Sequence, residues 1–282
     1  MDGDYLSLVV NAAFQTQTIT SLLSLLFLTF ARLFPIILLV PFFGSKVLPH
    51  PVKVAFGFSL FVIFLPMLVQ VTTTPLGFNV WLIFLLVKEF LIGYIIGFLM
   101  SIPFFIVQNA GMFIDHQRGG ASLMINDPAV QNQSSPLGTL FNFVLIFIFF
   151  MIDGPFLFID AIIKSYEIIP PDRILNPLFF SEDSPFWHMQ FQLYNKLMVL
   201  SVQLASPGLI TILMTDVFLG IINRLAPQIQ ITFLGLPLKS LLALAVITVG
   251  WKVFTDQMAE ESLSFLVSVK EFIHFLGIGQ PT

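Results

Sequence analysis

A few ionisable side chains lie inside long apolar stretches of this chain, and they are the residues that could do chemistry. Lys88 and Glu89 are adjacent in one stretch, and Asp153, Asp160 and Asp216 lie in or beside two others. An ionisable group at mid-membrane costs at least about 2.5–3.5 kcal/mol, so such groups normally face protein or water. The three aspartates could therefore form a proton pathway, although Asp153 could equally cap the helix that follows it.

Lys88 and Glu89 admit two interpretations. Adjacent residues on a helix point about 100° apart, so these two do not form the self-contained pair that i,i+4 spacing allows. In the first interpretation, Lys88 extends its ammonium toward the surface while Glu89 meets a partner. In the second, the two charges form ion pairs between subunits at assembly.

The sequence excludes most other chemistry. It contains no cysteine, which rules out disulfides, iron–sulfur clusters, thiol nucleophiles and cysteine zinc sites. Its four histidines are scattered without metal-ligand spacing, and it has no GxSxG motif, so an intramembrane enzyme lacks its machinery. The net charge of −4 comes without a basic patch, which argues against nucleic acid as a partner. We expect no catalytic residue, no metal and no cofactor.

The elements that carry these charges are long apolar blocks. Of the 282 residues, 57% are apolar and 10% are charged, whereas soluble proteins carry about 25% charged residues. A helix needs ~20 residues to cross the membrane, and continuous blocks lack the alternation of barrel strands. We predict an all-α, polytopic membrane-associated protein with about six apolar segments: Ile19–Val40, Val54–Val71, Val80–Val107, Leu140–Ile163, Leu197–Ile222 and Leu234–Phe254.

Several blocks contain residues that are unusual in a plain membrane span. Arg32 and Pro35 interrupt the first block, Asp153-Gly154-Pro155 the fourth and Ser206-Pro207-Gly208 the fifth. Because proline removes a backbone donor and kinks a helix, we expect broken helical hairpins that are sheltered by other subunits. Broken helices can also form the midplane site of a secondary transporter, a class whose inverted repeats are not visible here.

A polar insertion separates the third and fourth blocks. Between Gln108 and Thr139 the sequence is rich in amides, hydroxyls and glycines. Loops longer than ~12–15 residues in a compact protein are usually functional or disordered. Two interpretations remain open from composition: an ordinary solvated loop, or a segment that lines or closes an aqueous conduit.

A hairpin is predicted between Asp216 and Lys239. A helix should end near Arg224, whose charge suits a helix C-terminus, and Pro227 should begin a turn. Gly235 and Pro237 predict a second turn before the next apolar block.

Beyond Phe254 the chain becomes amphipathic. Apolar residues recur at steps of three, four or seven, which predicts a helix that packs on a partner or lies at the interface. They are Phe254, Met258, Phe265, Val269, Phe272 and Leu276.

Three segments together resemble a known family. They read ARLFPIILLVPFFGSKVLPHPVKVAFGFSLFVIFLP, DHQRGGASLMINDPAVQNQSSPLGTLFN and NRLAPQIQITFLGLPLK, and they occur in the expected order. The chain resembles the SctT/FliR family, the T-type subunit of the type III secretion export apparatus, from about Phe30 to Leu244.

The resemblance implies a function and a set of partners. Family members are non-enzymatic core subunits of an export gate in the bacterial inner membrane, through which unfolded proteins pass. The R-type and S-type subunits (flagellar P and Q) would complete a helical cone with this chain, and the U-type switch and V-type gate-ring subunits would adjoin it. The whole chain, 1–282, would be one export-gate domain, R-like over about 1–190 and S-like over about 191–282.

The resemblance also implies roles for particular residues. Residues 111–138 would plug the channel, with Asp115, Arg118 and Asp127 as tethers. The plug set is Gly111, Asp115, Arg118, Gly119, Gly120, Asp127, Pro128, Gln131, Gln133 and Gly138. The expected subunit-interface set is Arg32, Pro35, Lys88, Glu89, Arg224, Pro227, Gln228, Gly235, Pro237 and Lys239.

Overall fold

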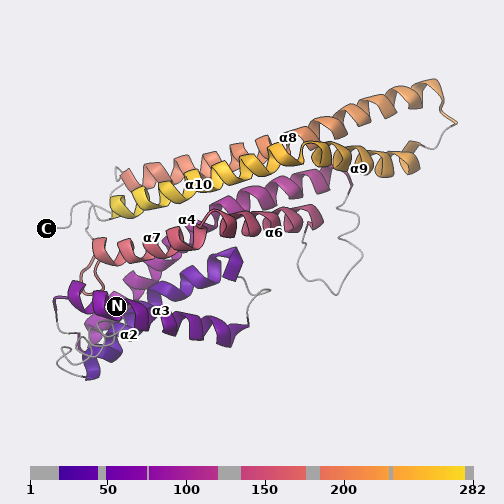
Figure 1. Ribbon diagram of the computed structural model, residues 1–282. Coiled ribbons are helices and arrows are strands. Elements are labelled where there is room, and N and C mark those ends of the chain that lie inside the picture. The colour runs from indigo at the N-terminus through magenta and orange to yellow at the C-terminus, as the bar shows by residue number, and fades with distance from the viewer. Residues whose placement is uncertain are drawn as a thin grey trace. The chain divides into compact units, whose positions relative to one another are not determined.

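The computed structural model describes residues 19–43, 49–74, 76–119, 135–175, 185–228 and 231–276. Within these ranges every regular element is helical, which confirms the all-α prediction (Figure 1). The elements are α2 (Ile19–Leu39), the 3₁₀ turn η1 (Pro41–Phe43), α3 (His50–Val71), α4 (Val80–Gln117), α6 (Pro136–Met151), α7 (Gly154–Ile168), α8 (Pro185–Leu225), α9 (Ile231–Val249) and α10 (Trp251–Leu276).

The predicted number of apolar segments is confirmed. Among the described helices, four are long and apolar enough to cross a membrane by themselves, and they coincide with α2, α3, α4 and α8. Two further candidates are bent pairs: α6 with α7, at 78°, and α9 with α10, at 67°. Counting each bent pair as one span gives up to six, so this is a membrane protein.

The chain divides into two compact units. The first comprises Met1–Ser101, Gly154–Phe191 and Phe265–Thr282, and the second comprises Ile102–Asp153 and Gln192–Ser264. The first unit therefore holds α2, α3, α7 and the first half of α4, and in it α2 packs along α3. The expected division of the chain near residue 190, into one part that resembles the R-type subunit and one that resembles the S-type subunit, stays a prediction.

Three expectations about helix ends are wrong. The second turn expected at Gly235 and Pro237 is absent, because both residues lie inside α9. The break expected at Ser206-Pro207-Gly208 is also absent, because α8 continues through Pro207. The polar insertion begins later than expected, since α4 runs to Gln117. Proline is tolerated inside apolar helices where neighbouring groups satisfy the carbonyl that it leaves free.

The break at Asp153 is confirmed. Helix α6 ends at Met151 and α7 begins at Gly154. Asp153 adopts a left-handed conformation with φ of 59°, which non-glycine residues rarely take and which aspartate tolerates better than most. The exposed Asp153 side chain therefore marks a sharp change of chain direction.

The hairpin and the terminal helix follow the sequence pattern. Helix α8 ends at Leu225, one residue after Arg224, and a turn includes Pro227. In α10 the apolar residues Phe254, Met258, Phe265 and Val269 are buried. This confirms an amphipathic helix that uses its apolar stripe for packing.

Candidate functional site

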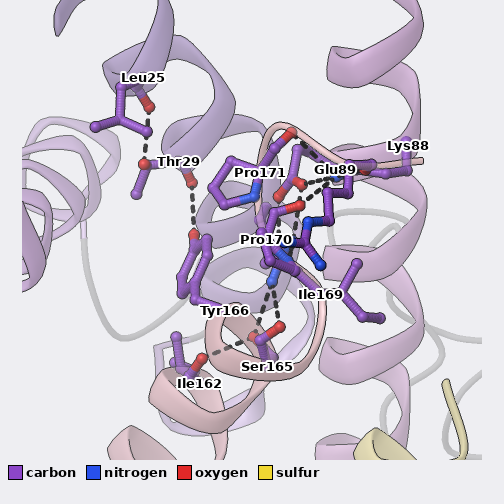
Figure 2. Close-up of polar contacts among 12 residues, drawn as sticks. Leu25, Thr29, Lys88, Glu89, Ile162, Ser165, Tyr166, Ile169, Pro170 and Pro171 are labelled. Carbon is purple, nitrogen blue, oxygen red and sulfur yellow. Dashed lines mark hydrogen bonds and ion pairs between the residues drawn. The ribbon is translucent and has the colours of Figure 1, made fainter. Parts of the chain in front are cut away.

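A cluster of buried charges lies in the first unit, where α2 meets α4 (Figure 2). Arg32 and Glu89 are fully buried. The Arg32 Nε donates to Glu89 Oε2 at 2.5 Å, and Nη2 donates to Oε1 at 2.8 Å. Such a two-point contact between guanidinium and carboxylate is the strongest common form of ion pair. The partner of Glu89 is therefore Arg32 of the same chain.

Arg32 also holds the end of α7. Its Nη1 donates to the carbonyl of Ser165 at 2.8 Å, and its Nη2 donates to the carbonyl of Ile169 at 2.8 Å. The guanidinium lies 4.1 Å from the centre of the Tyr166 ring, within cation–π distance. The last carbonyls of a helix lack intrahelical partners and form the negative end of its dipole. A buried arginine from α2 thus caps the C-terminus of α7.

Lys88 binds the chain that follows α7. Its Nζ lies 2.5 Å from Glu89 Oε1, and it donates to the carbonyls of Pro170, Pro171 and Arg173 at 3.0, 3.2 and 2.8 Å. The Lys88 side chain is only 7% exposed, so it does not extend to the surface as the first interpretation supposed. Its charge is balanced by Glu89 and by carbonyl oxygens that have no helical partner.

Asp172 completes the anchoring of this segment. Its Oδ2 accepts from the backbone N–H groups of Thr73 and Thr74 at 2.9 and 3.0 Å, and from both hydroxyls at 3.1 Å. The residues 169–173 are therefore fixed by α2, by α4 and by the chain that follows α3. Sequence analysis missed Asp172, because nothing near it in the sequence identifies Thr73 and Thr74 as its donors.

Glycine lets α2 and α4 approach closely enough for this pairing. A Cβ at Gly93 would collide with the Arg32 carbonyl oxygen, and one at Gly97 would lie 2.9 Å from the Ile36 Cα. Gly93 is one helical turn beyond Glu89. The missing side chains therefore set the helix separation at which Arg32 and Glu89 meet.

A second polar cluster, which we call the insertion clamp, lies in the second unit and consists of Asp115, Arg118, Ser135 and Leu137. Asp115 is buried and accepts from the Ser135 hydroxyl and from the Leu137 N–H, the latter at 2.9 Å. Arg118 Nε donates to Asp115 Oδ1 at 2.7 Å. The clamp joins the last turn of α4 to the first turn of α6.

The local sequence explains the α6 side of the clamp. Ser135 is the N-cap of α6, where its Oγ accepts from the Gly138 N–H at 2.9 Å, and Pro136 occupies the first turn. Serine at the N-cap followed by proline is a favoured helix start. A Cβ at Gly111 would collide with the backbone of Gly138, so these two glycines let α4 and α6 touch.

The clamp also touches α9. Arg118 Nη1 lies 3.4 Å from Ser240 Oγ. Gly119 has a φ of 93°, a conformation that favours glycine, and a Cβ there would collide with Leu236. Of the expected plug set, Gly120, Asp127, Pro128, Gln131 and Gln133 lie outside the described residues.

The expected interface set divides by burial. Arg32, Pro35, Lys88, Glu89 and Gly235 are buried within the chain itself. Lys239 forms an ion pair with Asp216, and Asp160 pairs with Lys164 at 3.4 Å, so these two carboxylates have cationic neighbours. The remaining members, which are exposed, are Arg224, Pro227, Gln228 and Pro237. Contact of any member of the expected interface set with another subunit stays a prediction.

The fold and these clusters define a helical membrane protein whose buried charges hold its helices together. No group of three or more potential metal ligands occurs among the described residues. Residues 23–264 match the family described as bacterial export proteins, family 1. Because this match covers most of the chain, the protein belongs to that family.

Individual relatives agree with this assignment. The chain is 29% identical to the secretion system apparatus protein SsaT of Salmonella typhimurium over 190 residues, which are 67% of this chain and 71% of SsaT. It is 31% identical to the surface presentation of antigens protein SpaR of Shigella flexneri over 228 residues, 77% of this chain and 81% of SpaR. It is 27% identical to the flagellar biosynthetic protein FliR of Bacillus subtilis over 223 residues, which are 79% of this chain and 84% of FliR. The resemblance to the SctT/FliR family is thereby confirmed.

Proposed function

We propose that this protein is a core structural subunit of a type III export gate in the bacterial inner membrane, where it helps to form and to close the channel for unfolded proteins. Membership of the export family and the set of apolar helices support a membrane subunit of the export apparatus. Its partners would be the R-type and S-type subunits, with the U-type and V-type subunits adjoining.

The insertion clamp is the observation that carries the closing role. Asp115 binds Ser135 and Leu137, so the two ends of the polar insertion lie together at one place. Between those ends the sequence is dominated by amides, hydroxyls and small residues, which can hydrogen-bond to a channel wall directly or through water. A segment tied at both ends to rigid helices can obstruct a channel without being part of the helical core.

A secondary transporter is the alternative that the sequence left open. The breaks near Pro155 and Pro207 were the examples behind that alternative; the first is present at the start of α7, whereas α8 continues through Pro207. The matching family and relatives are export proteins, which favours the export gate.

Shortening the insertion between Gly120 and Gln133 tests the proposal. The assembled complex should form in normal amounts, but cells should become permeable to a normally excluded small solute, and planar bilayers should show conductance. A variant that replaces the same residues with a glycine–serine segment of equal length should leak less, because the obstruction keeps its bulk. A shortened protein that assembles, stays tight and secretes normally would reduce the segment to an ordinary loop.

A further inference from the structure

The end of α4, where the polar insertion begins, contacts helices α8 and α9 of the same unit. Gly208 of α8 lies against Ile114 of α4, since a Cβ added to this glycine would be 3.2 Å from the Ile114 side chain. Ile114 directly precedes Asp115 of the insertion clamp. Arg118 and Gly119, which follow, contact α9. The clamp therefore has neighbours beyond α4 and α6, and the proposed function gives these neighbours no role.

One row of residues on α9 contacts the end of α4. Leu236 and Ser240 are four residues apart, so they lie on the same face of the helix. Leu236 packs on Gly119, where an added Cβ would collide with the leucine side chain. Ser240 Oγ lies 3.4 Å from Arg118 Nη1. Both contacts of this row are therefore made with the two residues that lead from α4 into the insertion.

The neighbouring row on α9 contacts α8. Gly235 and Lys239 are also four residues apart, and this row is turned by about 100° from the first. A Cβ at Gly235 would be 3.3 Å from the Leu219 side chain of α8, and Lys239 forms an ion pair with Asp216 of α8. The same stretch of α9 thus contacts α8 and the end of α4 at once. The packing of α9 on α8 therefore determines which side chains α9 presents to the start of the insertion.

Gly119 is the residue at which the chain turns away from α4. Its N–H donates to the carbonyl of His116 at 3.2 Å, and its φ of 93° is the left-handed conformation with which many helices end. Leu236 packs on this turn, and its side chain is 48% exposed. A half-exposed leucine buries only part of its apolar surface, so its contribution to overall stability is modest. The contact nevertheless lies at the residue that sets the direction of the insertion.

We propose that α9 positions the polar insertion, with Leu236 and Ser240 as the positioning residues and α8 as the support that holds α9. This inference rests on the proposed closing role, because it names the contacts that keep the closing segment in place. The insertion clamp ties the two ends of the insertion to each other, whereas the α9 contacts fix the direction in which the first end leaves α4. A subunit that shifts α8 or α9 can therefore alter closure without touching the insertion itself.

Truncating Leu236 tests the positioning role. The chain has no cysteine, so Ser122→Cys gives this subunit a single thiol, within the insertion. The assembled complex is treated with a water-soluble maleimide, and the labelling rate of this subunit is read after separation on a gel. Leu236→Ala should raise the rate roughly fivefold, because it removes the partial burial of the leucine side chain. Leu241→Ala is the control, since Leu241 is 65% exposed on α9 and lies outside the contact row. Equal rates in the two variants would overturn the proposal.

Smaller changes keep the question answerable if Leu236→Ala lowers the yield of complex. Leu236→Val removes one carbon, and Ser240→Ala removes only a hydroxyl, whose 3.4 Å contact is long for a hydrogen bond. Each should raise labelling about twofold, because each weakens one contact of the row without removing the whole. Leu236→Met keeps the size of the side chain and should label at the rate of the parent protein. Unchanged labelling in both Leu236→Val and Ser240→Ala would contradict the positioning role.

Solute uptake by cells that carry the same variants separates this inference from the closing role. Faster labelling of Leu236→Ala together with raised uptake supports both. Faster labelling without uptake, when the shortened insertion is also tight, would mean that α9 positions the segment but that the segment closes nothing. A leaky shortened protein, beside a Leu236→Ala variant that neither labels faster nor leaks, would overturn the positioning role and leave the closing role standing.

Discussion

The charge cluster of Arg32, Lys88 and Glu89 and the insertion clamp around Asp115 satisfy buried charge in different ways. In the charge cluster, the groups neutralise one another and bind carbonyls of Ser165, Ile169 and the following chain. In the clamp, a single carboxylate accepts from a hydroxyl and an N–H at the start of a helix, with its cation three residues away.

The difference predicts different consequences of damage. The charge cluster connects α2, α4 and the end of α7, so removing one member leaves the others buried without compensation. The clamp joins only the ends of one insertion, and its Arg118 side chain is partly exposed. We infer that the cluster maintains the fold, whereas the clamp controls one segment of it.

Glu89→Leu should have the largest effect. Arg32 and Lys88 would remain buried without an anion, and breaking a buried ion pair in this way costs about 3–5 kcal/mol. The yield of assembled complex in detergent and its thermal midpoint should both fall steeply. Glu167→Leu is the matched control, because Glu167 is exposed on α7 and its loss should change neither quantity.

The double variant Arg32→Leu with Glu89→Leu sharpens this prediction. Removing both partners leaves Lys88 with its three carbonyl acceptors and removes the unpaired guanidinium. The complex should therefore recover part of the stability lost in Glu89→Leu. A double variant that is less stable than either single variant would show that the cluster acts through packing and not through charge balance.

Gly93→Ala and Gly111→Ala should show the next largest effects, one in each region. A Cβ at either position would collide with the backbone of a neighbouring helix, and overpacking of this kind costs about 1–3 kcal/mol. Gly220 in α8 has no atom within 4 Å of an added Cβ, so Gly220→Ala should be neutral or stabilising. The thermal midpoints of the three complexes give the comparison, and equal values would mean that the helices can separate freely.

Much of the fold could be predicted from the sequence because apolar length and local breaks are local signals. The apolar blocks, the break at Asp153, the helix end near Arg224 and the stripe of α10 all follow from a few neighbouring residues. Two prolines led to wrong predictions, because packing against neighbouring helices and not the local sequence decides the backbone conformation there. Pro207 and Pro237 lie inside helices, because packed neighbours can stabilise a helix that the isolated sequence would interrupt.

The charge cluster could be predicted only in part. Arg32 and Glu89 were expected at an interface with other subunits, whereas the structure pairs them with each other inside this chain. Their pairing joins positions 57 residues apart, and Lys88 binds carbonyls more than 80 residues away. No periodicity links such positions. Asp115 and Arg118 were expected as tethers of a plug through the family resemblance; in the structure Asp115 binds Arg118 and the start of α6, and the tether role stays a proposal.

Asp115→Ala should have a smaller effect on stability and a visible effect on closure. It removes the acceptor of the Ser135 hydroxyl and the Leu137 N–H, a loss of about 1–3 kcal/mol for buried donors. The complex should still assemble, but uptake of a normally excluded solute should rise. Asp115→Asn keeps one acceptor oxygen and should leak less. Asp160→Ala removes a half-exposed carboxylate and serves as the control. Loss of assembly without leak would place Asp115 with the fold-maintaining residues.

Lys239→Ala should have the smallest effect. Lys239 and Asp216 form an ion pair between α9 and α8, but their side chains are 19% and 38% exposed. Pairs of this kind contribute about 0–1 kcal/mol, because partial solvation already stabilises each charge alone. A double-mutant cycle with Asp216→Ala, followed by the thermal midpoint of the complex, should give a coupling energy below ~1 kcal/mol. A loss in Lys239→Ala as large as in Glu89→Leu would mean that burial does not distinguish structural ion pairs in this protein, and the contrast between the two regions would have to rest on the number of helices that each one joins.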